Sequence, residues 1–207
     1  ERSRLVGELH AELAQLGPEY RLPLLEIAFP ALRRRPRPQL DYLVDLTRRM
    51  IELDGEIDLY EFCFYRLLMT AIEGGWHPLS RPRKRKRAEV RDAALGLLRA
   101  IAHYGHRDAA SAAAAFDAGR AQFGDWAGEA TYADDAGSDV PTLERQLDVL
   151  QALNTDGRRM LVNAVGAVVM ADNHVAVAEA ELLRAVCATL DCPLPPVVTG
   201  FHGAGDA

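Results

Sequence analysis

The sequence has little of what several protein classes depend on. It contains three cysteines in 207 residues, and aromatic residues make up 7% of the chain. The odd and small number of cysteines excludes a disulfide scaffold. Cys63, Cys187 and Cys192 also lack C-x-x-C spacing, which argues against a zinc knuckle. No run reaches the roughly 18–20 uninterrupted apolar residues that a membrane-spanning helix needs. The N-terminus also lacks the basic and apolar regions of a secretory signal.

Motifs of common enzymes are missing as well. The sequence has no H-E-x-x-H, no glycine-rich phosphate loop and no G-x-S-x-G element. His103 and His106 form H-x-x-H, but Gly105 stands between them, where a helix should end. We therefore do not expect the two histidines to share one rigid helix face. Catalysis by this chain itself is not expected.

The sequence is rich in apolar residues at helical spacing. Hydrophobic residues make up 49% of the chain. They recur every three or four residues in almost every segment, which is typical of amphipathic helices. Glycine and proline separate these segments. The expected helices cover about 5–16, 22–32, 40–51, 62–69, 90–104, 108–123, 141–150, 157–171 and 177–190. The fold class predicted from this pattern is an all-α bundle of about seven to nine helices.

Two stretches of the sequence align at one constant spacing. The first contains Leu43, Ile51, Asp54, Ile57 and Glu61, and the matching residues of the second are Leu161, Val169, Asp172, Val175 and Glu179. Each copy therefore consists of a helix, an acidic turn and a second helix that begins near a glutamate. Such self-similarity indicates a duplicated unit. Because one helix pair cannot bury its own apolar face, we expect the two copies to pack together.

This pattern predicts a single all-helical domain over residues 1–207. The first half-repeat covers about 20–73 and the second about 140–192. A connecting region of about 74–139 is rich in basic and then in acidic residues and contains two helices. Residues 193–207 form a tail rich in proline and glycine that cannot extend the last helix.

The first acidic turn matches only the second half of an EF-hand loop. Asp54, Gly55 and Glu61 fit the pattern, but the first ligand position holds Met50. Calcium takes six to eight oxygen ligands, so loss of that carboxylate argues against calcium binding of the EF-hand kind. The alternative is structural. Asp58 and Glu61 have the spacing of a capping box at the start of a helix.

Other residues of the two turns have structural interpretations too. Gly55 and Asn173 accept the left-handed backbone that a helix C-terminus often requires. Ile57 and Val175 are expected to anchor their turns on the core. Ala176 stands where the first copy has Asp58, so the second copy should lack that cap.

The run 81–87 has six basic residues in seven positions. One interpretation is a solvated loop that joins the two halves, since like charges repel one another. Another is that Arg81–Arg87 contacts an anionic membrane surface. No nucleic-acid partner is expected, because the formal charge of −6 becomes −12 once these six positive charges are set aside.

Two sets of strings resemble a known family. The pair ELDGEIDLYEF and MADNHVAVAEAELLRAVCATLDCPLP resembles the TerB-like (tellurite-resistance B) helical module. More narrowly, LPLLEIAFPALRRRPRPQLDYLVDL and AEAELLRAVCATLDCPLPP resemble the C-terminal extension of bacterial membrane-bound zinc metalloproteases of the HtpX/prenyl-protease type. The similarity covers about residues 20–73 and 140–196.

The resemblance implies a fragment of a longer enzyme whose H-E-x-x-H motif, zinc ion and transmembrane helices precede Glu1. It places the domain on the cytoplasmic side of the inner membrane, tethered through the missing N-terminal part. The implied function is a non-catalytic interaction or regulatory domain without a cofactor of its own. Its partners would be other proteins or the protease domain of its parent.

The alternative function is a metal- or ligand-sensing module that uses the acidic turns. The resemblance to TerB-like modules gives the candidate metal-binding residues by matching position. These are Asp54, Glu56, Asp58, Glu61, Asp172 and Glu179.

Overall fold

The computed structural model describes residues 2–53, 55–73, 84–133 and 138–196. These residues form nine α-helices and two short 3-10 turns, and they contain no β-strand. The predicted all-α fold and the predicted number of helices are confirmed.

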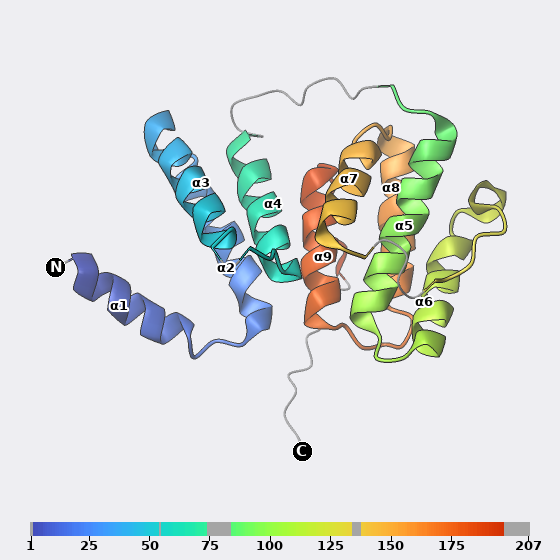
Figure 1. Cartoon of the computed structure of the whole chain (residues 1–207), viewed down its shortest axis with the longest axis horizontal. Coiled ribbons are helices and arrows are strands. Elements are labelled where there is room, and N and C mark those ends of the chain that lie inside the picture. The colour runs from blue at the N-terminus through green and yellow to red at the C-terminus, as the bar shows by residue number, and fades with distance from the viewer. Residues whose placement is uncertain (1, 54, 74–83, 134–137, 197–207) are drawn as a thin grey trace, which may run out of the picture.

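Helices α1 to α4 make up the N-terminal part, and α5 to α9 make up the rest (Figure 1). Each of the nine overlaps a segment with helical spacing of apolar residues. Their bounds, with those of the 3-10 turns η1 and η2, are α1 Arg2–Leu13, η1 Pro18–Tyr20, α2 Arg21–Leu32, α3 Arg37–Ile51, α4 Leu59–Glu73, α5 Arg87–Gly105, α6 Ala109–Ala121, η2 Gly124–Ala127, α7 Val140–Leu150, α8 Thr155–Val169 and α9 Val177–Thr189.

The helix bounds repeat at the spacing seen in the sequence. Helix α8 begins 118 residues after α3 (155 against 37) and ends 118 residues after it (169 against 51). The same shift carries the start of α4 onto the start of α9 and the end of α2 onto the end of α7. The repeating unit thus has three helices, with α2, α3 and α4 corresponding to α7, α8 and α9. Helices α5 and α6 lie between the two copies in the sequence.

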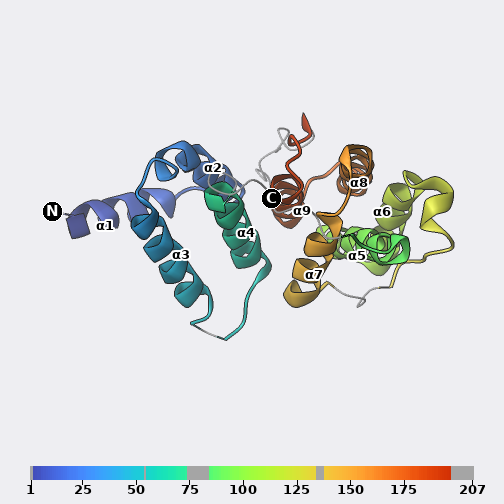
Figure 2. The ribbon, with the colours of Figure 1, turned by 90° about the horizontal axis from the view of Figure 1, so that it is seen from above.

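The two copies meet through their last helices. Helices α4 and α9 lie side by side and run in the same direction (Figures 1 and 2). Arg66 of α4 donates to Asp148 of α7 at 2.7 Å and to the hydroxyl of Thr189 of α9 at 3.2 Å. Arg184 of α9 donates to Glu26 of α2 at 2.5 Å. Ion pairs therefore link the copies in addition to apolar packing.

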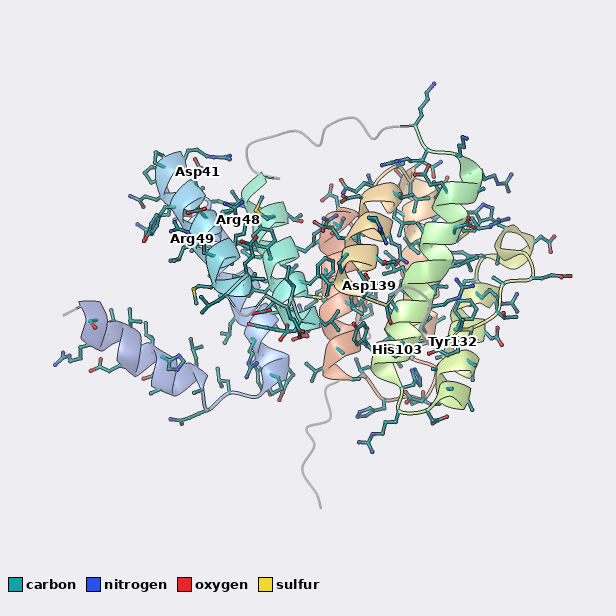
Figure 3. The ribbon with its side chains drawn as sticks, viewed as in Figure 1. Asp41, Arg48, Arg49, His103, Tyr132 and Asp139 are labelled. Carbon is teal, nitrogen blue, oxygen red and sulfur yellow. The ribbon has the colours of Figure 1, made fainter. Side chains whose placement is uncertain are left out.

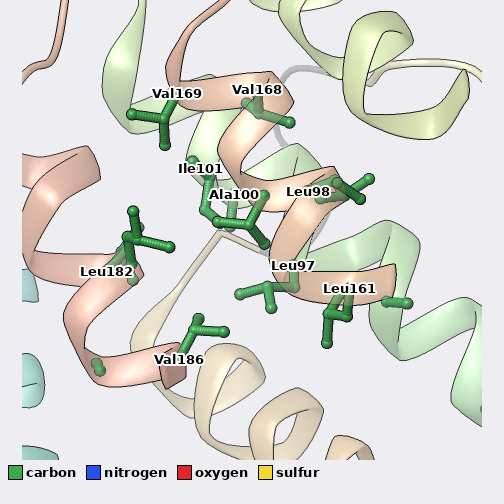
Figure 4. Close-up of a cluster of buried hydrophobic side chains, with 14 of the residues drawn as sticks. Leu97, Leu98, Ala100, Ile101, Leu161, Val168, Val169, Leu182 and Val186 are labelled. Atoms are coloured by element: carbon green, nitrogen blue, oxygen red, sulfur yellow. The ribbon is translucent and has the colours of Figure 1, made fainter. Parts of the chain in front are cut away.

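The main core is centred on α5. This helix packs against α6, α7, α8 and α9, and its Leu97, Leu98 and Ile101 are fully buried. They meet side chains of α8 and α9 such as Val168 and Leu182 (Figure 4). A smaller cluster of Leu40, Leu68 and Ile72 joins α3 to α4. The second copy is thus embedded in a much larger core than the first.

Candidate functional site

The first acidic turn is organised by the predicted capping box. After α3 ends at Ile51, Gly55 adopts a positive φ of 81°. The backbone N–H of Glu61 donates to Asp58 Oδ1 at 2.8 Å, and the N–H of Asp58 donates to Glu61 Oε2 at 3.2 Å. Both carboxylates thus satisfy amide groups at the start of α4 that have no partner within the helix. The helix-end interpretation of this turn is confirmed.

The second turn repeats this geometry in part. Asn173 has a φ of 61°, and Asp172 accepts a hydrogen bond from the N–H of His174 at 2.9 Å. Glu179 accepts from the N–H of Ala176 at 3.0 Å. Alanine has no side-chain acceptor, so the reciprocal bond of the first copy has no counterpart here, as expected.

The six candidate metal-binding residues lie in different surroundings. Asp54 lies outside the described residues. Glu56, Asp58 and Asp172 are exposed, Glu61 is half-buried, and Glu179 is buried. Within the described ranges, no three His, Cys, Asp or Glu side chains are grouped so as to hold a metal ion. Metal binding at the turns stays a prediction.

Ile57 does not occupy the position that we expected. It is 46% exposed, whereas Val175 is half-buried and packs against the main core. The prediction of core anchoring is wrong for Ile57. The two turns differ because the second lies beside the end of α5, which brings His106 within 3.9 Å of Asp172.

The end of α5 forms a buried polar cluster with the second turn. The side chain of His106 is 2% exposed, and its Nδ1 lies 3.1 Å from the carbonyl oxygen of Ala102. The same Nδ1 lies 4.0 Å from Glu179 Oε1, and Nε2 lies 3.9 Å from Asp172 Oδ2. Neither His106 Nε2 nor Glu179 Oε1 has a hydrogen-bond partner among the described residues. Buried polar atoms without a protein partner are uncommon, and each calls for an explanation such as a bound water, an ion or a functional role.

Glycine at position 105 makes this arrangement possible. A Cβ atom placed on Gly105 would lie 2.6 Å from Cγ of Glu179, which is far inside a normal contact. The glutamate side chain therefore lies directly over the backbone of α5. Its carboxylate is 1% exposed as a consequence.

Two buried glutamates of α9 have raised pKa values. Burial raises the pKa of Glu179 to about 7, the hydrogen bond from Ala176 opposes the rise, and the negative charge of Asp172 adds to it. Burial also raises the pKa of Glu181 to about 7, the charge of Asp58 adds to the rise, and Arg21 opposes it. Both carboxyl groups can therefore gain or lose a proton near neutral pH.

Sequence reasoning identified neither His106 nor Glu181 as part of a site. His106 approaches Glu179 only through the packing of α5 on the second repeat, and the two are 73 positions apart (106 and 179). One signal for Glu181 was present in the sequence. Its charge lies within the apolar run of α9, between Ala180 and Leu182.

The buried cysteines behave as small apolar residues. Burial raises the pKa of the Cys63 thiol well above its ordinary value, and the charges of Glu181 and Asp58 add to this effect. Burial also raises the pKa of Cys187 to about 12. Since the thiolate is the reactive form of cysteine, neither side chain suits nucleophilic chemistry at neutral pH.

Two clefts could accept a small ligand. One, of about 390 Å³, lies beside the first turn and is lined by Ile57, Glu61 and Arg66 among others. The other, of about 540 Å³, lies near the start of α8, and Trp126 and Met160 contribute to its lining. Both volumes fall in the usual range for small-molecule sites. Neither cleft includes Glu179 or His106.

The basic run is described only in part. Arg81–Arg83 lie outside the described residues, and Arg87 is the first residue of α5. Arg85 pairs with Glu89 at 2.8 Å. No helix in the described ranges is long and apolar enough to cross a membrane.

Comparison of the chain with family models, with curated proteins and with solved structures gives no match.

Proposed function

We propose that this chain is a non-catalytic helical interaction domain. The observation that carries the proposal is the uneven distribution of exposed apolar side chains. Of the large hydrophobic residues that are exposed in the described chain, all but Met160 and Met170 precede α4. Soluble proteins rarely leave so much apolar surface on one part of the molecule unless a partner covers it.

These side chains lie on helices rather than in loops. Helix α1 exposes Leu5, Val6, Leu9 and Leu13, and helix α3 exposes Leu46 and Met50. Side chains that lie on one rigid helix face form a surface of defined shape. Such a surface suits an apolar helix or groove of another protein.

The resemblance to metalloprotease C-terminal extensions suggests the identity of one partner. On this proposal the domain belongs to a membrane-bound zinc metalloprotease and docks on the protease domain or recruits other proteins to it. The full gene tests the proposed parent directly, because an upstream H-E-x-x-H followed by apolar spans is expected. A gene without them contradicts this part of the proposal.

Binding is tested by titrating the chain into the purified protease part of that gene product in a calorimeter. We expect saturable binding, weakened at least tenfold by the double substitution Leu46→Glu and Met50→Glu. Met160→Glu with Met170→Glu is the matched control, since both methionines are exposed on the other repeat. Equal weakening by both pairs of substitutions contradicts a specific role for the α3 face.

A second candidate function is sensing of a metal ion or ligand at the acidic turns. It is favoured by the buried atoms His106 Nε2 and Glu179 Oε1, which have no hydrogen-bond partner in the part of the chain that the structure describes. Calorimetric titration with calcium, zinc and manganese tests the metal form of this function. Flat heats for all three ions contradict it.

A further inference from the structure

The repeat shows which face of α3 has no other described helix packed on it. In the second copy, α6 packs closely on α8. A Cβ placed on Gly119 of α6 would collide with Val168 and would lie 2.9 Å from the carbonyl oxygen of Ala164. Val168 and Ala164 are fully buried as a result.

The corresponding residues of the first copy are exposed. By the constant spacing of the repeat, Leu46 corresponds to Ala164 and Met50 corresponds to Val168. Leu46 is 38% exposed and Met50 is 66% exposed. The face of α3 that these residues define, here called the α3 face, is thus the face that a helix covers in the second copy. It extends past the end of α3 to Leu53, which is 87% exposed.

Among the described residues, helix α1 of the same chain has no close packing partner. Every residue of α1 from Ser3 to Leu13 is exposed. Val6, Leu9 and Leu13 follow one another at spacings of three and four residues, which is the spacing of a helix–helix seam. In Figure 1, α1 extends outward from the lower end of α2 and lies apart from α3.

The charges beside the two apolar stripes are complementary. Glu12 immediately precedes Leu13 on α1, and Arg49 immediately precedes Met50 on α3. Each charged residue stands one position before an apolar residue of its stripe. If the two helices pack in antiparallel orientation, residues at this position face each other across the seam, so Glu12 would lie near Arg49. Arg49 is bonded to Asp45 of its own helix but is 64% exposed and accessible to a second carboxylate (Figure 3). Charged residues beside an apolar seam select the partner and its orientation.

We infer that α1 of one chain packs against the α3 face of a second copy, and that α1 of the second copy packs reciprocally on the first. The inference rests on the proposed function and names the chain itself as one partner of that surface. A second copy is the occupant, because α1 lies apart from α3 in its own chain and only residues 14–17 join it to η1. A reciprocal exchange closes after two chains, since it occupies both α1 helices and both α3 faces.

The test measures the mass of the whole 207-residue chain in solution. Sedimentation equilibrium is expected to give twice the chain mass of 22.7 kDa at high concentration. Leu9→Glu with Leu13→Glu removes the α1 stripe, and Leu46→Glu with Met50→Glu removes the α3 face. Each pair is expected to weaken association at least 100-fold. All four side chains are exposed, so helical circular dichroism should not change.

Mixing provides the decisive observation. The α1 variant retains an intact α3 face, and the α3 variant retains an intact α1. An equimolar mixture should therefore associate through one of the two contacts, although neither variant associates alone. Met160→Glu with Met170→Glu should leave the mass unchanged.

Three outcomes would overturn the inference. The first is that the unmodified protein has the mass of a single chain at all concentrations. The second is a dimer that neither pair of substitutions weakens. The third is that the mixture of the α1 variant and the α3 variant stays monomeric. If the chain is monomeric but the protease part still binds the α3 face, this inference fails and the proposed function stands. If neither self-association nor that binding occurs, both fail.

Discussion

His106 Nδ1 and Glu179 Oε1 lie 4.0 Å apart, buried where the end of α5 meets the start of α9. The histidine follows an inserted helix, and the glutamate belongs to the acidic turn of the second repeat. Their contact couples the insertion to the repeat. Burial at this junction raises the pKa of the Glu179 carboxyl group to about 7.

The raised pKa of Glu179 predicts a pH-dependent stability. Because the folded value is about 7 and the ordinary value is 4.5, the folded chain holds more protons than the unfolded chain between these pH values. The free energy of unfolding should therefore fall as pH rises from about 4.5 to about 7, and Glu181 should add to the fall. The upper limit is about 3 kcal/mol for each group. Urea unfolding at several pH values between 4 and 8 measures it.

Substitution of the two buried glutamates isolates their contribution. Glu179→Gln and Glu181→Gln should each flatten the pH dependence and raise stability at pH 8, because neither amide ionises. Glu61→Gln, the counterpart of Glu179 in the first repeat, is the control and should cost well under about 1 kcal/mol. An unchanged pH profile in the double variant of Glu179 and Glu181 would contradict the assignment.

Gly105→Ala should destabilise the protein by about 1–3 kcal/mol, because the new Cβ would collide with the side chain of Glu179. Gly166→Ala is the matched control. A Cβ at that position in the interior of α8 meets nothing within 4 Å, so alanine should raise stability by about 0.5–1 kcal/mol. Thermal melts compare the two variants. Adding Glu179→Ala to Gly105→Ala should restore much of the stability that the collision removes. If stability does not recover, the collision with Glu179 is not the cause of the loss.

Arg66→Met should weaken the junction between the repeats by about 1 kcal/mol. The arginine side chain is 16% exposed and contacts both Asp148 and Thr189, but Asp148 is itself 52% exposed, so solvent screens the pair. Arg159→Met removes an exposed pair within α8 and should change stability by less than about 0.5 kcal/mol. Chemical denaturation of both variants gives the difference. Equal effects would show that the Arg66 contacts contribute nothing particular to the junction.

Substitution of the residue that caps the start of α4 and of its counterpart at the start of α9 should change stability in opposite directions. Asp58→Ala should cost about 1 kcal/mol, because it removes the acceptor for the N–H of Glu61. Ala176→Ser supplies the missing acceptor at the start of α9 and should raise stability by about 0.5–1 kcal/mol. Thermal melts at pH 6 measure both changes. A loss of stability in the serine variant would mean that the hydroxyl cannot reach its amide.

Substitution of the apolar turn residues should have different effects on stability in the two copies of the repeat. Val175→Asp should destabilise by about 2–3 kcal/mol, because it places a charge against the main core. Ile57→Asp should cost less than about 1 kcal/mol, since this position is already 46% exposed. Urea unfolding of both variants tests the difference. Equal losses would contradict the different surroundings of the two side chains.

Local features of this protein could be predicted from its sequence. Helix positions follow from the spacing of apolar residues, since an amphipathic helix carries its apolar side chains along one face. The left-handed backbone at Gly55 and the capping box of Asp58 and Glu61 depend on residues within a few positions of one another. Short-range geometry of this kind is encoded in the local sequence.

Features that depend on which helices pack together could not be predicted in this way. Ile57 and Val175 occupy the same place in the repeat, yet only Val175 packs against the main core. The approach of His106 to Glu179 and the raised pKa values of α9 depend on the docking of α5 against the second copy. Local pattern shows that a helix has an apolar face, but the arrangement of distant segments decides what covers that face. The same reason explains why Met50 is exposed while Val168 is buried.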